Sequence, residues 1–193
     1  MTSNPVKRPA TYADLLKVPE AEIAEIVDGD LHASPRPSAP HAGCAAALIA
    51  DLGPPFQHGR GGPGGWLFFF EPELHLEEDV LVPDLAGWRR ERLPKPPDAP
   101  AITLAPDWLC EILSPSTERL DRARKLPAYA RHGVVYAWLI NPTARTLEVL
   151  RAEGGRWVLL GTFADDVRVR AEPFDAVELD LFLLWGEGRS DNG

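Results

Sequence analysis

The clearest hydrophobic pattern in the sequence is the short run WLCEIL at residues 108–113, which carries a single glutamate near its centre. In a β-strand, alternate side chains point to opposite faces, and both faces of this run are apolar. Such a run is typical of a strand inside a sheet that is covered on both sides. Glu111 would then lie between two leucines, where an unpaired carboxylate costs several kcal/mol. Its charge therefore requires a cation, a metal ion or a bound proton.

The N-terminal half of the chain combines helical and strand patterns. Thr11 is suited to begin a helix, and Gly53 follows an alanine-rich helical stretch that it would end. Asp28-Gly29 favours a tight hairpin turn. The predicted elements are a helix at residues 11–16, a hairpin at 24–34, a helix at 38–53 and two strands, 66–76 and 80–88, that turn at 77–79. The glycine-rich residues 57–65 lack the Gly-Lys-Ser/Thr of a phosphate-binding loop and predict a surface loop.

The C-terminal half continues with a buried strand, a long helix and further strands. Ser116 or Thr117 would begin the helix, and Gly133 would end it. Pro127 lies inside this helix, where it would kink the helix or begin a new first turn. After a proline-rich connection, the predicted elements are a strand at residues 107–114, a helix at 114–133, a strand at 134–140, a hairpin at 146–163, and one or two strands with a short helix near 179–185.

Together these elements predict an α/β fold with the central order helix, strand, strand, strand, helix, strand, and with additional β-hairpins at both ends. A strand, a helix and a second strand in one sheet require a right-handed crossover, which favours a mixed sheet covered by helices. The 193 residues and six tryptophans fit one folded domain. We expect this domain to cover residues 11–185, with flexible ends at 1–10 and 186–193.

The sequence contains neither the apolar core of a signal peptide nor a run of roughly 18 apolar residues that could span a membrane. Its two cysteines, Cys44 and Cys110, are expected to be small buried hydrophobic residues. Two such cysteines fit a reducing cytoplasm better than a disulfide-stabilised fold. We therefore expect a cytoplasmic protein without a membrane partner.

The net charge of −9 argues against a protein that binds nucleic acid without specificity. The charge is uneven, because residues 84–131 hold nine basic and seven acidic residues whereas the rest of the chain holds 11 and 22. A solvated surface is the usual reason for such a local excess of basic residues, and contact with phosphate groups is the alternative.

Asp84 is a second carboxylate on an apolar strand, where it shares a face with Val82 and Ala86. Two buried carboxylates on adjacent strands repel each other unless they share a proton or a cation. A hard divalent ion such as Mg²⁺ binds one or two carboxylates and keeps waters or substrate phosphates as its other ligands. A structural aspartate in a turn after Pro83 is the alternative.

Asp121, Lys125 and Tyr129 recur every four residues and therefore share one face of the predicted helix. On a solvated surface, the Asp121–Lys125 pair would contribute about 0.3–0.5 kcal/mol to stability. If the helix instead returns over the end of the strand, Lys125 can reach toward Asp84 and Glu111. The residue pattern alone leaves both interpretations open.

Two stretches, VPDLAGWRRERLP at residues 82–94 and PDWLCEILSPSTERLDRARKLPAYARHGVVYAWLINP at 106–142, resemble the Uma2 family, also called DUF820. The stretch EIVDGDLHASPRPSAPHAG at 25–43 resembles the opening of the same family, and the likeness covers roughly residues 11–185. This family belongs to the PD-(D/E)XK nuclease superfamily. The resemblance implies a restriction-endonuclease-like core, DNA as substrate and Mg²⁺ (or Mn²⁺) as cofactor.

Carried over to this chain, the resemblance makes Asp84 the aspartate of the motif and Glu111 its second acid. The backbone carbonyl of Ile112 would be a further metal ligand. The superfamily places its lysine two positions after the acid, where this chain has Leu113. The resemblance to Uma2 implies that a helical lysine, Lys125, substitutes for it.

Four more residues are candidates for the site. Glu25 and His41 match further Uma2 positions, and Asp121 and Tyr129 share the face of Lys125. Glu25 would add a carboxylate, and a solvent-facing strand residue is the alternative. His41, near the start of a helix, would contact phosphate or cap the site, and an ordinary surface histidine is the alternative.

The leading hypothesis is therefore metal-dependent hydrolysis of DNA phosphodiester bonds. A second is a nuclease-like module that keeps its acids but only binds nucleic acid or protein. A third is a structural homo-oligomer whose carboxylates are merely hydrogen-bonded. The apolar runs LFFF at residues 67–70 and FLLW at 182–185 predict exposed patches, and hence a homodimer.

Overall fold

The computed structural model of the chain describes residues 8–186, and most of the two ends expected to be flexible lie outside the described residues. Where the description begins, the Ala10 backbone N–H donates to the Gly29 carbonyl over 2.8 Å. The first helix, α1 (Tyr12–Leu15), begins after Thr11 as predicted, and the side chain of Asp14 accepts a hydrogen bond from the Thr11 backbone. These contacts hold the N-terminal segment on the domain from residue 10 onward.

A six-stranded mixed sheet forms the centre of the domain. From one edge to the other, its strands are β10 (Arg156–Ala164), β9 (Thr146–Glu153), β8 (Tyr136–Asn141), β7 (Trp108–Ile112), β6 (Leu85–Arg89) and β3 (Trp66–Phe70). β7 and β8 are parallel, as the predicted strand–helix–strand crossover requires, and the other neighbours are antiparallel. The α/β fold predicted from the sequence is confirmed.

A smaller antiparallel sheet lies beside the first. Its strands, in order, are β2 (Asp30–Pro35), β1 (Glu22–Val27), β5 (Asp79–Leu81) and β4 (Leu74–Leu76). The hairpin of β1 and β2 turns at Asp28-Gly29 as predicted, and both turn residues have positive φ. The two long strands expected at residues 66–76 and 80–88 are each broken in two. One part of each strand (β3 or β6) lies in the large sheet, and the other part (β4 or β5) lies in the small sheet.

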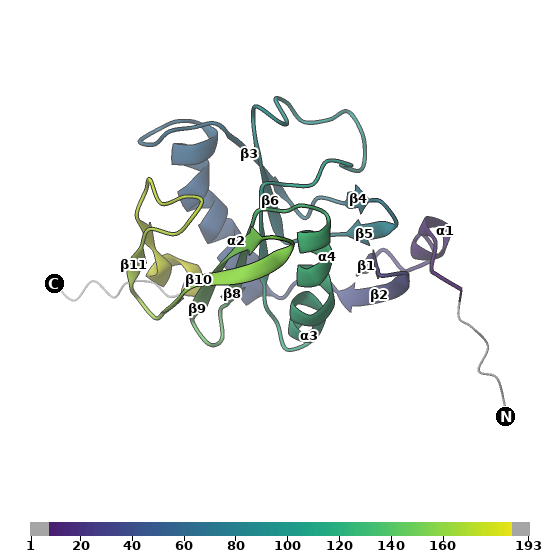
Figure 1. Cartoon of the computed structure of the whole chain (residues 1–193). Helices are drawn as coiled ribbons and strands as arrows, with labels where there is room; N and C mark the ends of the chain where they lie inside the picture. The colour runs from purple at the N-terminus through teal and green to yellow at the C-terminus, as the bar shows by residue number, and fades with distance from the viewer. Residues whose placement is uncertain (1–7, 187–193) are drawn as a thin grey trace.

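The elements form layers around the large sheet (Figure 1). On one face lies α2 (Ala39–Leu52) with the C-terminal segment, which contains β11 (Arg168–Val169), β12 (Leu179–Asp180) and the 3₁₀ turn η3 (Leu181–Trp185). On the other face lie the small sheet and a helix made of α3 (Glu118–Leu120), η2 (Asp121–Lys125) and α4 (Leu126–Arg131).

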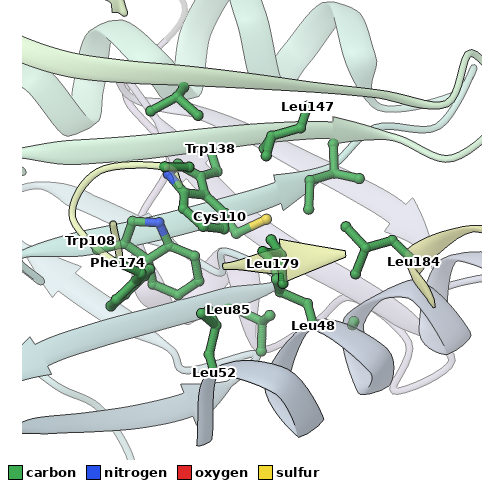
Figure 2. Close-up of a cluster of buried hydrophobic side chains, with 14 of the residues drawn as sticks. Leu48, Leu52, Leu85, Trp108, Cys110, Trp138, Leu147, Phe174, Leu179 and Leu184 are labelled. Carbon is green, nitrogen blue, oxygen red and sulfur yellow. The ribbon is translucent and has the colours of Figure 1, made fainter. Parts of the chain in front are cut away.

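Strand β7 separates two apolar cores. Trp108, Cys110 and Ile112 point into the core under α2, whereas Leu109 points into the core under α4. Figure 2 shows the first core, where side chains of the sheet meet those of α2 and of the C-terminal segment. Phe174 lies within 4.8–5.6 Å, centroid to centroid, of five other aromatic rings, namely Phe56, Trp66, Phe68, Trp108 and Trp138.

Pro127 does not break the long helix, because one π-helical turn precedes it. A proline ring cannot accommodate the carbonyl four residues earlier and supplies no N–H. The chain responds with a wider turn, η2, which the Leu126 N–H closes by donating to the Asp121 carbonyl. The α-helix then restarts with Pro127 in its first turn, which is one of the two outcomes the sequence predicts.

Gly53 does not end the helix that precedes it, contrary to the sequence prediction. Its φ of −61° is right-handed, and the helix continues as the π-helical turn η1 (Gly53–Gln57). Pro54 and Pro55 supply no N–H, and the His58 N–H donates to the Gly53 carbonyl over 3.1 Å at the end of this turn.

The apolar runs expected at a dimer interface are only partly exposed, which weakens the reason given for that prediction. Leu67, Phe68 and Leu184 are buried, the last two in the core under α2, whereas Phe70 and Leu183 are exposed. Cys44 and Cys110 are free and buried, as predicted. Within residues 8–186, no helix has the length and the apolar character needed to cross a bilayer.

Candidate active site

The candidate site lies at the seam where one hairpin passes from the large sheet to the small sheet. At this point the Glu71 N–H donates to the Asp84 carbonyl over 3.0 Å. β6 then continues in the large sheet, whereas β5, three residues earlier, belongs to the small one. Pro83 supplies no N–H at this break, which suits a position where ladder pairing stops. The side chain of Asp84 therefore leaves the sheet at a site bordered by both sheets.

Asp84 is held by the neighbouring strand. Its Oδ2 accepts a hydrogen bond from the Ile112 backbone N–H over 2.6 Å and lies 3.2 Å from His41 Nε2. Both side chains are largely buried, with 14% and 11% of their surface exposed. The structural interpretation of Asp84 and the functional one are therefore compatible, because one oxygen joins β6 to β7 while the carboxylate faces a pocket.

Glu111 is compensated by a lysine and a tyrosine of the helix. Lys125 Nζ lies 3.0 Å from Glu111 Oε1, and the Tyr129 hydroxyl donates to the same oxygen over 2.7 Å. All three residues are buried. The helical lysine therefore returns over the strand, and the alternative of a solvated surface pair is wrong.

Lys125 contacts three carboxylates and one backbone carbonyl. Its Nζ lies 2.9 Å from Glu25 Oε1 and 3.6 Å from Asp121 Oδ1, and it donates to the Val82 carbonyl over 3.2 Å. Glu25 Oε1 also accepts the Val82 N–H over 2.7 Å. Glu25 is 4% exposed, so the alternative of a solvent-facing strand residue is wrong. The N-terminal hairpin contributes directly to the site.

These residues line one solvent-connected pocket of about 160 Å³. Its acidic side chains are Glu25, Asp84, Glu111 and Asp121, and its cations are Lys125 and the rim residue Arg36. Arg36 is 56% exposed and hydrogen-bonds the Glu20 carbonyl. The rim of the pocket also carries several hydroxyl side chains, contributed by Ser34, Ser38, Ser114, Ser116 and Thr117. The interior of the pocket therefore holds more negative than positive charge.

The excess negative charge is reflected in the pKa values of the buried groups. Burial raises the pKa of Glu111 well above its usual value, Asp121 and Asp84 add to the rise, and Lys125 opposes it. Burial likewise raises the pKa of Asp121. For Lys125, burial lowers the pKa, but the nearby carboxylates, led by Glu111, outweigh it and the net pKa is raised. The lysine is therefore a protonated cation, and Glu111 and Asp121 hold protons more readily than exposed carboxyls do.

The pKa of His41 is also raised by the groups that surround it in the pocket. Burial is the largest influence and lowers the pKa, but the nearby Asp84 carboxylate and the Ile112 backbone outweigh it. His41 lies in the first turn of α2 and is not an ordinary surface histidine, so that alternative is wrong.

The donor set fits a divalent ion that takes only part of its ligands from protein. Within residues 8–186, no three histidine, cysteine, aspartate or glutamate side chains are grouped closely enough to hold a metal on their own. Mg²⁺ typically uses one or two carboxylates and completes its shell with water and phosphate. Among the described residues, no hydrogen bond engages Asp84 Oδ1 or Glu111 Oε2. Both acids therefore retain an oxygen for a cation.

All seven candidate side chains predicted from the sequence are brought to this seam. The sequence did not point to the Val82 carbonyl, which accepts from Lys125, or to the hydroxyl groups and Arg36 on the rim. The break in the 80–88 strand at Pro83 was the available signal for Val82. For Arg36 the only signal was its place between two prolines after a strand, which is typical of many surface loops.

Comparison with known proteins identifies the family of the chain. A family described as "Uma2: Putative restriction endonuclease" matches residues 9–181. The chain belongs to the Uma2 family. Among solved structures, the Uma2 fold seen here resembles a protein from Anabaena variabilis ATCC 29413, described as "a putative nuclease belonging to DUF820", with a TM-score of 0.72. The two chains are 24% identical, over 92% of this chain and 98% of the other. The curated proteins contain no match.

Proposed function

We propose that this Uma2 protein is an endonuclease that hydrolyses DNA phosphodiester bonds with a bound divalent cation, Mg²⁺ or Mn²⁺. The observation that carries the proposal is the pocket lined by four carboxylates and one buried lysine, which contacts three of them. Buried carboxylates in such excess require protons or a further cation. A divalent ion satisfies this requirement and attracts a phosphate at the same time.

Asp84, Glu111 and the backbone carbonyl of Ile112 would hold the ion. When bound, the ion polarises the scissile phosphate and lowers the pKa of a water molecule. The protein orients its two carboxylates from neighbouring strands, and the Ile112 N–H fixes Asp84 from one side. Tyr129 fixes Glu111 in the same way. The second oxygen of each acid is then oriented toward the pocket before any ligand arrives.

Lys125 would act as a cation and not as a base. Its pKa is raised by the surrounding carboxylates, so its amine keeps its proton at neutral pH. A protonated amine orients a water molecule or stabilises negative charge that develops on the phosphate. Glu25 and Asp121 would position Nζ for this role. This favours electrostatic stabilisation over deprotonation of the attacking water by the lysine.

Cleavage of plasmid and of single-stranded DNA tests the proposal directly. Purified protein is incubated with each substrate in Mg²⁺, Mn²⁺ or EDTA, beside Asp84→Asn and Glu111→Gln. We expect metal-dependent cleavage that falls at least about 100-fold in both variants, because the ion supplies several kcal/mol of transition-state stabilisation. Asp98→Asn, in an exposed loop, is the matched control. Full activity in either site variant would contradict the assignment.

The second candidate is a Uma2 module that binds DNA or protein without cutting. The observation that favours it is the position of Lys125, which already occupies the space between Glu25, Glu111 and Asp121. This candidate predicts DNA binding that weakens steeply with salt, and no product in any divalent metal. Filter binding between 50 and 200 mM salt, run with the cleavage assay, separates the two candidates.

A purely structural role for the carboxylates makes a different prediction. A ligand that binds only the native state adds about 2.7 kcal/mol to the free energy of unfolding at one hundred times its Kd, and so raises the melting temperature. The structural role predicts no effect of Mg²⁺ or Mn²⁺ on the melting temperature. Our proposal predicts a rise that Glu111→Gln reduces. Differential scanning calorimetry with and without metal distinguishes them.

We further propose that two copies associate, now on the basis of β10 and not of residues 67–70 and 182–185. β10 is a nine-residue edge of the large sheet, and Val158, Leu159 and Leu160 on it are exposed. Long apolar edge strands tend to pair with another chain. Sedimentation equilibrium at micromolar concentration should give the mass of a dimer, and a monomeric mass would contradict this.

A further inference from the structure

Arg36 stands at the rim of the acidic pocket, on the short loop that joins β2 to α2. β2 ends at Pro35 and α2 begins at Ala39, so the loop consists of residues 36–38. The side chain of Arg36 is 56% exposed, whereas that of Lys125, the other lysine or arginine that lines the pocket, is 4% exposed. Arg36 therefore presents its positive charge to a molecule that approaches the pocket from solvent.

The backbone that carries Arg36 is restricted by a proline on either side, Pro35 and Pro37. A proline has a fixed φ angle, and it confines the residue before it to an extended conformation. Arg36 Nη2 also donates to the Glu20 carbonyl over 3.0 Å, which uses one of the five N–H groups of the guanidinium. The guanidinium is thus anchored to the protein at one side while more than half of the side chain faces solvent.

A DNA phosphate that enters the pocket meets an excess of negative charge. Four acidic side chains line the pocket, against two lysine or arginine side chains. The charge of Lys125 is already shared among three of these acids. Each DNA phosphate brings a further negative charge. Attraction of the strand therefore requires an exposed cation at the rim, and Arg36 is in that position.

The lining of the pocket suits the sugar-phosphate backbone of DNA and not a base. Within residues 8–186, no phenylalanine, tyrosine or tryptophan side chain lines it. Proteins that hold an unstacked base usually place it against aromatic side chains. Phosphate oxygens instead accept hydrogen bonds from guanidinium groups, often two at once, and from hydroxyl groups. The hydroxyl side chains at this rim belong to Ser34, Ser38, Ser114, Ser116 and Thr117.

A structural role is the alternative for Arg36, because its Nη1 lies 3.8 Å from Glu71 Oε2. This distance is longer than a hydrogen bond, and the arginine of the pair is more than half exposed. Such pairs contribute little to stability. A purely structural Arg36 would affect the melting temperature and leave the binding of DNA unchanged.

We propose that Arg36 binds a phosphate of the DNA backbone at the rim of the pocket, and that it does so without regard to sequence. The guanidinium would hold this phosphate while a neighbouring phosphate of the same strand lies inside the pocket. Contacts to phosphate fix the position of the strand and carry no direct sequence information. This inference rests on the proposed function and specifies how its substrate is bound.

The test measures DNA binding separately from cleavage. Fluorescence anisotropy in EDTA gives the affinity for two labelled duplexes of equal length and unrelated sequence, between about 50 and 200 mM salt. Arg36→Gln and Arg36→Lys are compared with Arg60→Gln, which removes the same charge from another exposed loop. Cleavage of the same duplexes in Mg²⁺ or Mn²⁺ gives KM and kcat, and thermal melting verifies that each variant is folded.

We expect Arg36→Gln to bind both duplexes about 10-fold more weakly at about 100 mM salt. The slope of log affinity against log salt should become shallower by about 1, because one phosphate contact is lost. KM should rise by a similar factor while kcat changes by less than about 2-fold. Arg36→Lys should keep the slope but lose part of the affinity, since lysine lacks the planar fork that binds two oxygens. Arg60→Gln should match the wild type.

An equal loss of affinity in Arg36→Gln and Arg60→Gln would overturn the role of Arg36, and so would a loss confined to one duplex. A lower melting temperature with unchanged KM and salt slope would overturn it in favour of the structural role. In each of these cases, cleavage by the wild type would leave the proposed function intact. Wild-type protein that neither binds nor cleaves DNA would overturn the proposed function, together with this inference.

Discussion

The two faces of the five-residue strand β7 differ in what they bury: one face buries only apolar side chains, and the other buries a carboxylate. One face, with Trp108, Cys110 and Ile112, enters an entirely apolar core. The other face carries Glu111 among leucines, and its charge is compensated by Lys125 and Tyr129. The apolar face stabilises the fold through area and close packing, which do not depend on pH. The polar face holds charges that lower stability unless each is matched, and that require protons or a cation.

This difference implies that the polar face depends on a single residue more than the apolar face does. Lys125 contacts Glu25, Glu111 and Asp121, and Lys125→Met leaves all three carboxylates buried without their cation. We expect the free energy of unfolding at pH 7 to fall by about 3–5 kcal/mol. Urea denaturation measures it, and Lys95→Met, on an exposed loop, is the control.

The sign of the pH dependence sharpens this prediction. The pKa values of Glu111 and Asp121 are already raised in the folded state, and removal of Lys125 raises them further. A group with a raised folded pKa contributes stability below its unfolded pKa and loses that contribution as pH rises through the folded pKa. Part of the lost stability of Lys125→Met should therefore return between pH 7 and pH 5. A loss that is the same at both pH values would contradict the electrostatic origin.

A change on the apolar face should have a smaller effect and no dependence on pH. Phe174 is 2% exposed and packs against five aromatic rings. Phe174→Leu keeps most of the volume but removes the edge contacts, so we expect a loss of about 1–2 kcal/mol. Denaturation at pH 5 and pH 7 should give the same difference from wild type. A large change between the two would mean that the two faces are coupled.

The smallest expected effect is a gain in stability, whereas the two changes above lower stability. Glu111→Gln removes one negative charge from a pocket with an excess of them, while Lys125 keeps Glu25 and Asp121 as partners. We expect the metal-free protein to gain about 1 kcal/mol at pH 7, since one pKa unit corresponds to about 1.4 kcal/mol. The gain should disappear at pH 5, where Glu111 of the wild type is more often protonated. Destabilisation at pH 7 would mean that the Lys125 and Tyr129 contacts outweigh the burial of the charge.

Much of this arrangement could be predicted from local patterns. The alternation in residues 108–113 identified the two faces of β7, and the spacing of Asp121, Lys125 and Tyr129 placed them on one side of the helix. The π-helical turn does not separate these three residues, because the helix continues and all three reach the seam. Local periodicity and the resemblance to Uma2 were sufficient for these residues.

Burial of Glu25 could not be predicted in this way. In the sequence, Glu25 is one polar residue of a hairpin strand, and nothing nearby indicates which face is covered. Its burial follows from Lys125, which lies far along the chain, and from the pairing of β1 with β5. For the same reason, the burial of residues 67–70 and 182–185 could not be predicted, because it depends on which elements cover them. Local patterns show that a segment is apolar but not what packs against it.

The ion pair between Glu25 and Lys125 also has a consequence for synthesis on the ribosome. The two partners are separated by 100 positions, so at about 5–20 residues per second the glutamate waits on the order of 5–20 s for its lysine. The β5 neighbour of the hairpin emerges in the second half of that interval, but the carboxylate of Glu25 has no cation until Lys125 follows. We expect Glu25 to remain hydrated on the nascent chain, and the pocket to assemble only after the helix has emerged. A chain that stops before residue 125 would therefore lack not one side chain of the pocket but the assembled pocket.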